Sequence, residues 1–285
     1  MATIHDIGRR IRSVKNTAKV TRAMEMVAAS KMKRAQDRTV SGRPYTDRMK
    51  LVLSDLAARR YAYEESHPLL AKRPVTRIAV IHITPERGLC GGMVANVNRN
   101  LASFVLGQCV PVTFVAIGRK GLDFLLRTGL QVRARFLKLG DNPSVTDILP
   151  AAGVVISDYT DGFVDEVYIS YTMFVSTMNQ QPVIWRLLPI EPAGLETGQS
   201  VDYIYEPDPR IVLEHLLPRF VEMELYHALL ESIASEQSAR MVAMRNATDN
   251  ANEIIEDMTL TYNKVRQEMI TTELLDITSG AVALE

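Results

Sequence analysis

Two stretches of this chain lack the residues that interrupt helices. The chain has 15 Gly and 13 Pro, yet residues 219–279 and residues 9–41 contain neither. Glycine and proline weaken or end helices, so their absence predicts one long helix in each stretch. At a rise of about 1.5 Å per residue the longer helix would span about 90 Å, whereas a mean globular helix has only about 11–12 residues. A helix of this length must be explained by the way in which it packs against a partner.

Both stretches repeat apolar residues in heptads. Counted from Ile4, eight of ten a and d positions in the N-terminal stretch are apolar, and counted from Leu213, 14 of 18 are apolar in the C-terminal one. This 3.5-residue repeat is typical of a coiled coil. After Val14 the first seam changes from isoleucine to alanine, which would let a partner helix approach closely. A break is expected at or next to Pro44, because proline costs about 3 kcal/mol inside a helix.

The charges of the two stretches are opposite. Residues 1–60 hold 15 Lys or Arg against 5 Asp or Glu, residues 219–285 hold 5 against 12, and the whole chain has no net charge. A basic and an acidic helix from one chain favour antiparallel pairing with each other. The basic helix is alternatively a nucleic-acid-binding surface. Its heptad seam favours the coiled coil, and no nucleic-acid partner is expected.

The middle of the chain alternates strand-like and helix-like segments, which predicts a small, mostly parallel α/β domain of Rossmann-like type. The expected strands are 77–83, 110–117, 167–175 and 183–188, and the expected helices are 93–106, 119–127 and 145–158. Asp208 and Pro209 are suited to the N-cap and first position of the last helix. The predicted fold class is α/β, with a long antiparallel coiled coil. Residues 1–60 and 209–285 would form one rod, and residues 75–195 the α/β domain.

Glycine-rich turns are the candidate binding sites of the α/β domain. The sequence Gly-Leu-Cys-Gly-Gly at 88–92 lies between a strand and a helix, and Gly118 and Gly121 repeat this placement around Arg119 and Lys120. Strand-to-helix turns bind phosphate in many α/β proteins. However, neither GxGxxG nor a P-loop sequence is present, and tight turns explain the glycines equally well.

No set of residues predicts catalysis or metal binding. The five histidines lack metal-ligand spacing, and His82, inside a strand, is interpreted as a core residue with satisfied hydrogen bonds. Neither GxSxG nor HExxH occurs. Asp158 and Asp161 precede a glycine and are interpreted as solvated loop carboxylates. We therefore expect no catalytic site, no cofactor and no metal.

Composition and the first residues of the chain indicate the compartment in which we expect the protein. Hydrophobic residues make up 47% of the chain, which supports a sizeable core, but the apolar runs are too short to cross a bilayer. The first residues resemble neither a signal nor a transit peptide. Cys90 and Cys109 form no CxxC pair and fit a reducing interior. The expectation is a protein that stays in the compartment where it is made.

Several long motifs resemble one family. Residues 11–36, with Ala-Met-Glu-Met-Val-Ala-Ala-Ser-Lys-Met at their centre, closely resemble the N-terminal signature of the gamma subunits of F-type ATP synthases. Residues 235–250 and 262–281 resemble its C-terminal partner. The turn at 202–208 and the Gly-Leu-Cys-Gly turn fit the same family. The similarity extends over the whole chain, and no additional cysteine-bearing insertion like that of chloroplast members is present, so redox gating is not expected.

The resemblance implies a central rotor stalk. Its paired terminal helices would pass through a ring of three alpha and three beta subunits, and ATP would be bound and made on the beta subunits. Met24 would face the beta subunits, and Arg266 and Gln267 would form a polar catch with a beta-subunit loop. The implied contacts with the c-subunit ring and the epsilon subunit are Tyr203, Tyr205 and Glu206. The implied location is peripheral, on the cytoplasmic face of a bacterial cell membrane.

Two other functions remain compatible with parts of the pattern. A structural or signalling scaffold would show the same heptads, although it would not need the terminal motifs. A nucleotide-binding α/β enzyme would need the 88–92 turn to bind phosphate. Thermal stabilisation of the isolated protein by ATP or NAD would favour the enzyme.

Overall fold

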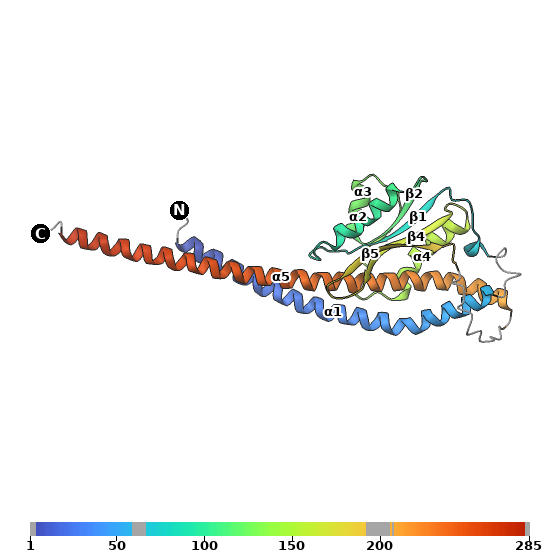
Figure 1. The fold of residues 1–285 in the computed structure, drawn as a ribbon, viewed down its shortest axis with the longest axis horizontal. Helices are drawn as coiled ribbons and strands as arrows, with labels where there is room; N and C mark the ends of the chain where they lie inside the picture. The colour runs from blue at the N-terminus through green and yellow to red at the C-terminus, as the bar shows by residue number, and fades with distance from the viewer. Residues whose placement is uncertain (1–3, 59–66, 192–205, 207, 283–285) are drawn as a thin grey trace. The chain divides into compact units, whose positions relative to one another are not determined.

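The structure, a computed structural model, describes residues 4–58, 67–191, 206 and 208–282 (Figure 1). By their internal contacts the residues group into two units. One, here called the terminal unit, contains residues 1–28 and 241–285, and the other, the central unit, contains residues 29–240. The division into 1–60, 75–195 and 209–285 stays a prediction.

Two very long helices confirm the expectation from the missing helix breakers. Helix α1 runs from Ile4 to Ala58 over 55 residues, and α5 runs from Pro209 to Val282 over 74 residues. The predicted start of α5 is confirmed, because the Arg210 backbone N–H donates to Asp208 Oδ1 at 2.7 Å, as an N-cap requires. The turn before it falls largely outside the described residues. None of the helices in the described ranges is long and apolar enough to cross a membrane.

Within the terminal unit the two helices pair in antiparallel orientation through the predicted seam. Thr21 and Thr248 are both buried, and their hydroxyl oxygens lie 2.7 Å apart. Earlier in α1, a Cβ at Gly8 would lie 3.6 Å from Tyr262 Cε2. Moving forward along α1 therefore means moving backward along α5. The buried residues Ala18, Ala28, Met244 and Ala251 occupy predicted a or d positions.

The break expected at Pro44 is wrong, because α1 continues through it to Ala58. Pro44 and Val40 are both exposed, so the Val40 carbonyl, which loses its intrahelical donor, lies on the solvent side of the helix. Five and nine residues after Pro44, Met49 and Leu53 are only 4% and 5% exposed. The packing of these side chains compensates for the local cost of the proline.

The central unit contains one five-stranded sheet in the order β3-β2-β1-β4-β5. Four strands match predicted ones: β1 (Ile78–Ile83), β2 (Val112–Ile117), β4 (Glu166–Phe174) and β5 (Gln180–Leu188). Strands β1 to β4 run parallel to one another, whereas β5 is antiparallel to β4. The mostly parallel sheet is therefore confirmed. The helices α2 (Met93–Leu106), α3 (Arg119–Arg127) and α4 (Val145–Thr160) also match expected segments.

Alternation along β1 separates the core into two layers. Ala79, Ile81 and Ile83 face one cluster that includes side chains from α4, α5 and α1. Ile78 and Val80 face a second cluster with α2 and α3. Successive residues of a strand point to opposite faces, so a strand buried on both faces is mostly apolar, and β1 is apolar except for His82.

Strand β3 (Val132–Phe136) was missed by the sequence prediction, and with it an ion pair. This edge strand has only five residues and includes two arginines. One of them, Arg133, donates to both carboxylate oxygens of Asp158 at 3.2 and 3.1 Å. Asp158 is 7% exposed, so its interpretation as a solvated loop carboxylate is wrong, whereas Asp161 is exposed as expected.

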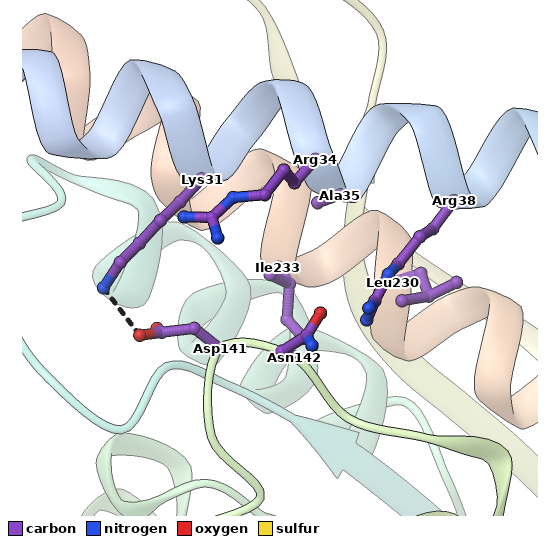
Figure 2. A pocket seen from close by; sticks show the side chains of 8 residues that line it. All are labelled: Lys31, Arg34, Ala35, Arg38, Asp141, Asn142, Leu230 and Ile233. Atoms are coloured by element: carbon purple, nitrogen blue, oxygen red, sulfur yellow. Dashed lines mark hydrogen bonds and ion pairs between the residues drawn. The ribbon is translucent and has the colours of Figure 1, made fainter.

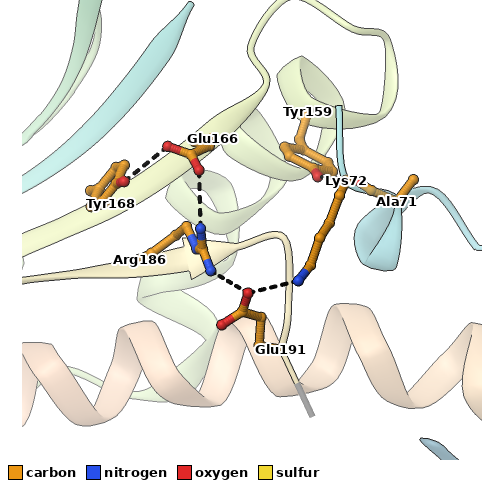
Figure 3. A network of polar contacts seen from close by, with 7 residues as sticks. All are labelled: Ala71, Lys72, Tyr159, Glu166, Tyr168, Arg186 and Glu191. Carbon is orange, nitrogen blue, oxygen red and sulfur yellow. Dashed lines mark hydrogen bonds and ion pairs between the residues drawn. The ribbon is translucent and has the colours of Figure 1, made fainter. Parts of the chain in front are cut away.

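A chain of polar contacts joins the segment before β1 to the end of the sheet (Figure 3). Glu191 Oε1 accepts from Lys72 Nζ at 3.0 Å and from Arg186 Nη2 at 2.5 Å. Arg186 also donates to Glu166 at 3.1 Å, and the Tyr168 hydroxyl donates to the same carboxylate at 2.9 Å. The two cations lower the pKa of the Glu191 carboxyl. The network therefore links the segment before β1 to the segment that follows β5.

His82 is a core residue with both ring nitrogens satisfied, as predicted. Its Nδ1 lies 3.1 Å from Ser170 Oγ, and its Nε2 lies 2.9 Å from Asn98 Oδ1. The side chain is completely buried. Burial lowers the pKa of the imidazole to about 4, although the Asn98 contact opposes the shift. His82 is therefore neutral in the folded chain at neutral pH.

His82 should make stability depend on pH. Below about pH 6.5 the unfolded chain binds a proton here that the folded chain does not, so unfolding is favoured by up to ~1.4 kcal/mol per pH unit down to about pH 4. We expect His82→Gln, which keeps polar groups near Asn98 and Ser170, to flatten this part of the profile. Urea unfolding of the full chain between neutral pH and about pH 5 measures the slope. The exposed His215→Gln is the control, and an unchanged slope in His82→Gln would contradict the assignment.

Candidate functional site

The last part of α5 is a helix surrounded by solvent. Every residue from Arg266 to Ser279 is exposed. We call this segment, residues 266–279, the bare tip. Five of its large apolar side chains are 44–68% exposed: Met269, Ile270, Leu274, Leu275 and Ile277. Exposed apolar surface of this extent indicates a binding surface. An isolated helix of this length is also only marginally stable in water, so the bare tip needs a partner.

The end of the partner helix explains why the tip is bare. Tyr262 lies opposite Gly8, and the described part of α1 begins only four residues before Gly8, at Ile4. Since the helices are antiparallel, residues of α5 beyond about one turn after Tyr262 lie past the described start of α1. Arg266 and Gln267 lie at the point on α5 where the described part of α1 no longer runs beside it, and both are exposed. The two side chains implied to form a polar catch are thus free to reach another chain.

Met24 lies on the other helix of the terminal unit. It is half-buried, whereas Met26 and Val27 are 61% and 53% exposed. Part of Met24 therefore remains available for contact, and Val27, three residues later on the same side of the helix, enlarges the apolar surface around it. Methionine adapts its shape to a changing partner without directional bonds.

Exposed cations accompany this apolar surface. Arg10, Arg12, Lys15, Lys19 and Arg22 of α1 are all exposed. The ion pair described for the terminal unit, Arg9 with Asp6 at 2.6 Å, lies within α1 and not between the helices. In the central unit, Lys50 of α1 does bind Glu224 of α5 at 2.9 Å. The predicted charge pairing is therefore confirmed there, while much of the basic charge faces outward.

The predicted contacts at the start of α5 are only partly described. Tyr203 and Tyr205 lie outside the described residues. Glu206 is exposed and lines a shallow pocket of about 350 Å³ with residues of the first turns of α5. Those residues are Ile211, Val212, His215, Leu216 and Arg219. The mixed lining of apolar and charged side chains is typical of a protein-contact surface.

The glycine-rich turn at 88–92 is anchored to α5. Cys90 is 2% exposed and packs with Met93 and Ala239. Arg240 Nη2 donates to the Gly88 carbonyl at 3.2 Å and to Glu236 Oε1 at 2.6 Å. Burial raises the pKa of the Cys90 thiol, so this cysteine is unreactive at neutral pH. These contacts favour a structural turn over a phosphate site.

Close packing explains the second pair of glycines. Gly118 has φ +90°, and a Cβ there would lie 1.9 Å from the Thr84 carbonyl oxygen. A Cβ at Gly121 would lie 2.7 Å from both the His82 ring and the Thr84 hydroxyl. Only glycine fits where α3 meets β1 so closely. Among the described residues no group of three His, Cys, Asp or Glu side chains is placed to hold a metal ion.

Sequence reasoning did not single out the apolar residues of the bare tip. A signal was present, because the heptad repeat fails after Met269: the next a and d positions are Thr272, Asp276 and Ser279. Adjacent leucines at 274 and 275 also point to different faces of a helix, so one partner helix cannot cover both.

The chain matches known proteins over its whole length. The family model described as ATP synthase matches residues 3–284. The ATP synthase gamma chain of Dehalococcoides mccartyi strain CBDB1 is 58% identical over 284 residues, covering 100% of both chains. That of Roseiflexus sp. strain RS-1 is 52% identical over 288 residues, covering 100% of this chain and 99% of the relative.

Solved structures share the fold. A chain of the Euglena gracilis mitochondrial ATP synthase OSCP/F1/c-ring structure aligns with a TM-score of 0.66 at 21% identity, covering 99% of this chain and 94% of that one. A chain of the Tetrahymena thermophila mitochondrial ATP synthase central stalk/c-ring structure aligns with a TM-score of 0.61 at 24% identity, covering 80% and 99%. Together with the full-length relatives, the antiparallel terminal helices and the five-stranded sheet place this chain in the gamma-chain family of ATP synthases.

Proposed function

We propose that this chain is the central rotor stalk of a proton-driven ATP synthase. It would transmit torque between the membrane c-ring and the ring of three alpha and three beta subunits. The observation that carries the proposal is the bare tip, an apolar helix end that has no partner helix among the described residues and that a surrounding ring of subunits would cover. The chain would have no catalytic site of its own, and it would bind peripherally at the cytoplasmic face of the membrane through the c-ring.

Asymmetry of the shaft would make the three catalytic sites unequal. A ring closed around two unlike helices meets a basic, apolar surface near Met24 on one side and α5 on the other. Each beta subunit would be biased toward an open or closed state according to its contact with the shaft. Inverting a 1:99 balance takes about 5.5 kcal/mol of differential affinity. A few charged contacts and steric exclusion by the shaft together reach this order.

The proposed contacts divide between the two regions of the chain. Met24, Arg266 and Gln267 would contact beta subunits. The residues proposed to contact the c-ring and the epsilon subunit are Tyr203, Tyr205 and Glu206. In this assignment the helices of residues 1–60 and 209–285 act as one shaft, and residues 75–195 form an α/β domain that lies outside the ring.

Co-expression with the alpha and beta subunits of the same organism tests the proposal. A stable ATPase assembly is expected only when this chain is present. With the membrane sector added, shortening both terminal helices should uncouple ATP hydrolysis from proton movement. The proposal is wrong if the assembly forms equally well without the chain, or if coupling survives the shortened helices.

Arg266→Ala should slow ATP hydrolysis of the assembled complex about tenfold, because a contact between charged groups contributes roughly 1.5–3 kcal/mol. Gln267→Ala, which removes a neutral contact, should have a smaller effect in the same assay. Arg127→Ala, which removes an exposed arginine from α3, is the matched control and should retain the wild-type rate. Equal rates in the Arg266 and Arg127 variants would refute the polar catch.

A further inference from the structure

A small pocket in the central unit lies between α1, α5 and the loop that follows β3 (Figure 2). Its volume is about 150 Å³. Lys31, Arg34 and Arg38 line it from α1, and Asp141 and Asn142 line it from the loop. The proposed rotor contacts do not use this pocket, so its chemistry needs a separate explanation.

The three cations share one face of α1. Their spacing of three and four residues places them on successive turns of the same side of a helix. Ala35, between the two arginines, is 5% exposed and also lines the pocket. Its small side chain leaves space between the longer ones. Figure 2 shows Arg38 extending from α1 toward Leu230 and Asn142, while Arg34 runs along α1 toward Lys31.

The pocket carries more positive than negative charge. Its one lining carboxylate, Asp141, is engaged by Lys31, whose Nζ lies 2.6 Å from Asp141 Oδ2. Within the described part of the chain, neither Arg34 nor Arg38 has an ion-pair partner. Both arginines line the pocket together with Lys31, and an anion placed among these like charges would reduce their mutual repulsion. The planar sets of N–H donors of the two guanidinium groups match the oxygens of phosphate and similar anions.

Size and polarity narrow the class of ligand. The volume exceeds the roughly 10–15 Å³ that one water needs and is smaller than the ~300–1,000 Å³ of pockets for drug-sized ligands. Ile233, 8% exposed, and Leu230, 4% exposed, form an apolar wall from α5. Such a wall lowers the local dielectric constant and strengthens charge-assisted hydrogen bonds.

We propose that this pocket binds a phosphate-class oxyanion. Arg34 and Arg38 would donate to its oxygens, the Asn142 amide would supply a further N–H donor, and Lys31 would add a nearby positive charge. The anion would connect α1 to the loop at Asp141 and so stabilise the central unit. Free inorganic phosphate and the terminal phosphate of a nucleotide have the same recognition chemistry, and the experiment below separates them.

Titration of the full chain with inorganic phosphate tests the proposal by calorimetry, by phosphorus NMR and by thermal unfolding. Phosphate should bind and raise the unfolding temperature, and chloride at equal ionic strength should not. Arg34→Gln and Arg38→Gln should each weaken binding about tenfold or more, which corresponds to ~1.4 kcal/mol for one lost contact. Arg10→Gln, at an exposed arginine of the same helix, should bind phosphate like the wild type.

Two further measurements, on an Asn142→Asp variant and with ATP as ligand, complete the test. Asn142→Asp places a second carboxylate in the pocket without altering α1, and it should also weaken binding if the arginine variants do not fold. Titration with ATP separates the two sources: ATP binding that depends on Arg34 and Arg38, without binding of inorganic phosphate, assigns the oxyanion to a nucleotide. The proposal is overturned if neither ligand binds the wild type, or if binding is unchanged in Arg34→Gln and Arg38→Gln. None of these readouts requires the rotor function.

Discussion

Replacing Leu274 and Leu275 together with glutamine should weaken assembly of the chain with the alpha–beta ring about 100-fold. The two side chains are 58% and 62% exposed in the free chain, so the substitution removes little internal packing. Covering them in a partner would contribute about 1.5 kcal/mol each, and every 1.4 kcal/mol is a tenfold change in affinity. The measurement is the dissociation constant of the chain for the alpha–beta ring.

A surface leucine far from the bare tip is the matched control. Leu106, at the end of α2, is 87% exposed, and Leu106→Gln should leave the affinity for the ring unchanged. Both variants should unfold at the same temperature as the wild type, because none of the three leucines is buried. Equal affinity of the double variant and the wild type would show that the bare tip is not the contact surface that we propose.

Gly118→Ala should destabilise the central unit by roughly 2–5 kcal/mol. The new Cβ would lie 1.9 Å from the Thr84 carbonyl oxygen, which belongs to the backbone directly after β1 and cannot move without disturbing the end of that strand. Strain at positive φ costs roughly 1–2 kcal/mol, and overpacking adds about 1–3 kcal/mol. Urea unfolding of the full chain, followed by circular dichroism, measures the loss.

Gly129→Ala separates the two contributions to this loss. Gly129 has φ +70°, close to that of Gly118, but nothing lies within 4 Å of an added Cβ. Its substitution should therefore cost only the backbone strain, about 1–2 kcal/mol. If both variants lose the same stability, close packing against Thr84 is not the reason for Gly118, and a turn requirement alone explains both glycines.

The long helices could be predicted because their signal is local and repeated. Missing helix breakers and a seam from Ile4 onward act through the backbone geometry of each turn, so they indicate helix without knowledge of the rest of the fold. The strands β1 and β2 were predicted for a similar reason, since a strand buried on both faces appears in the sequence as a nearly continuous apolar run. The family motifs further supplied the proposed beta-subunit contacts Met24, Arg266 and Gln267, but not the apolar residues of the bare tip.

Contacts between distant segments decided the remaining features. Strand β3 became recognisable only through its pairing with β2, and Arg133 on that strand explains why Asp158 is buried. Helix α1 continues past Pro44 because Met49 and Leu53 pack against the core, which outweighs an unfavourable local residue. Local sequence carries no information on such partners when they lie far away along the chain.

The amino-acid sequence by itself determined two long helices, their antiparallel pairing and the family. The tertiary structure decided where the pairing stops, because the register of Gly8 against Tyr262 leaves the residues after Arg266 without a described partner helix. It also brought Arg34 and Arg38 of α1 to the loop at Asn142, more than 100 residues away in the chain. Both features depend on the register and separation of elements, which are determined by packing over the whole fold and not by any single stretch of residues.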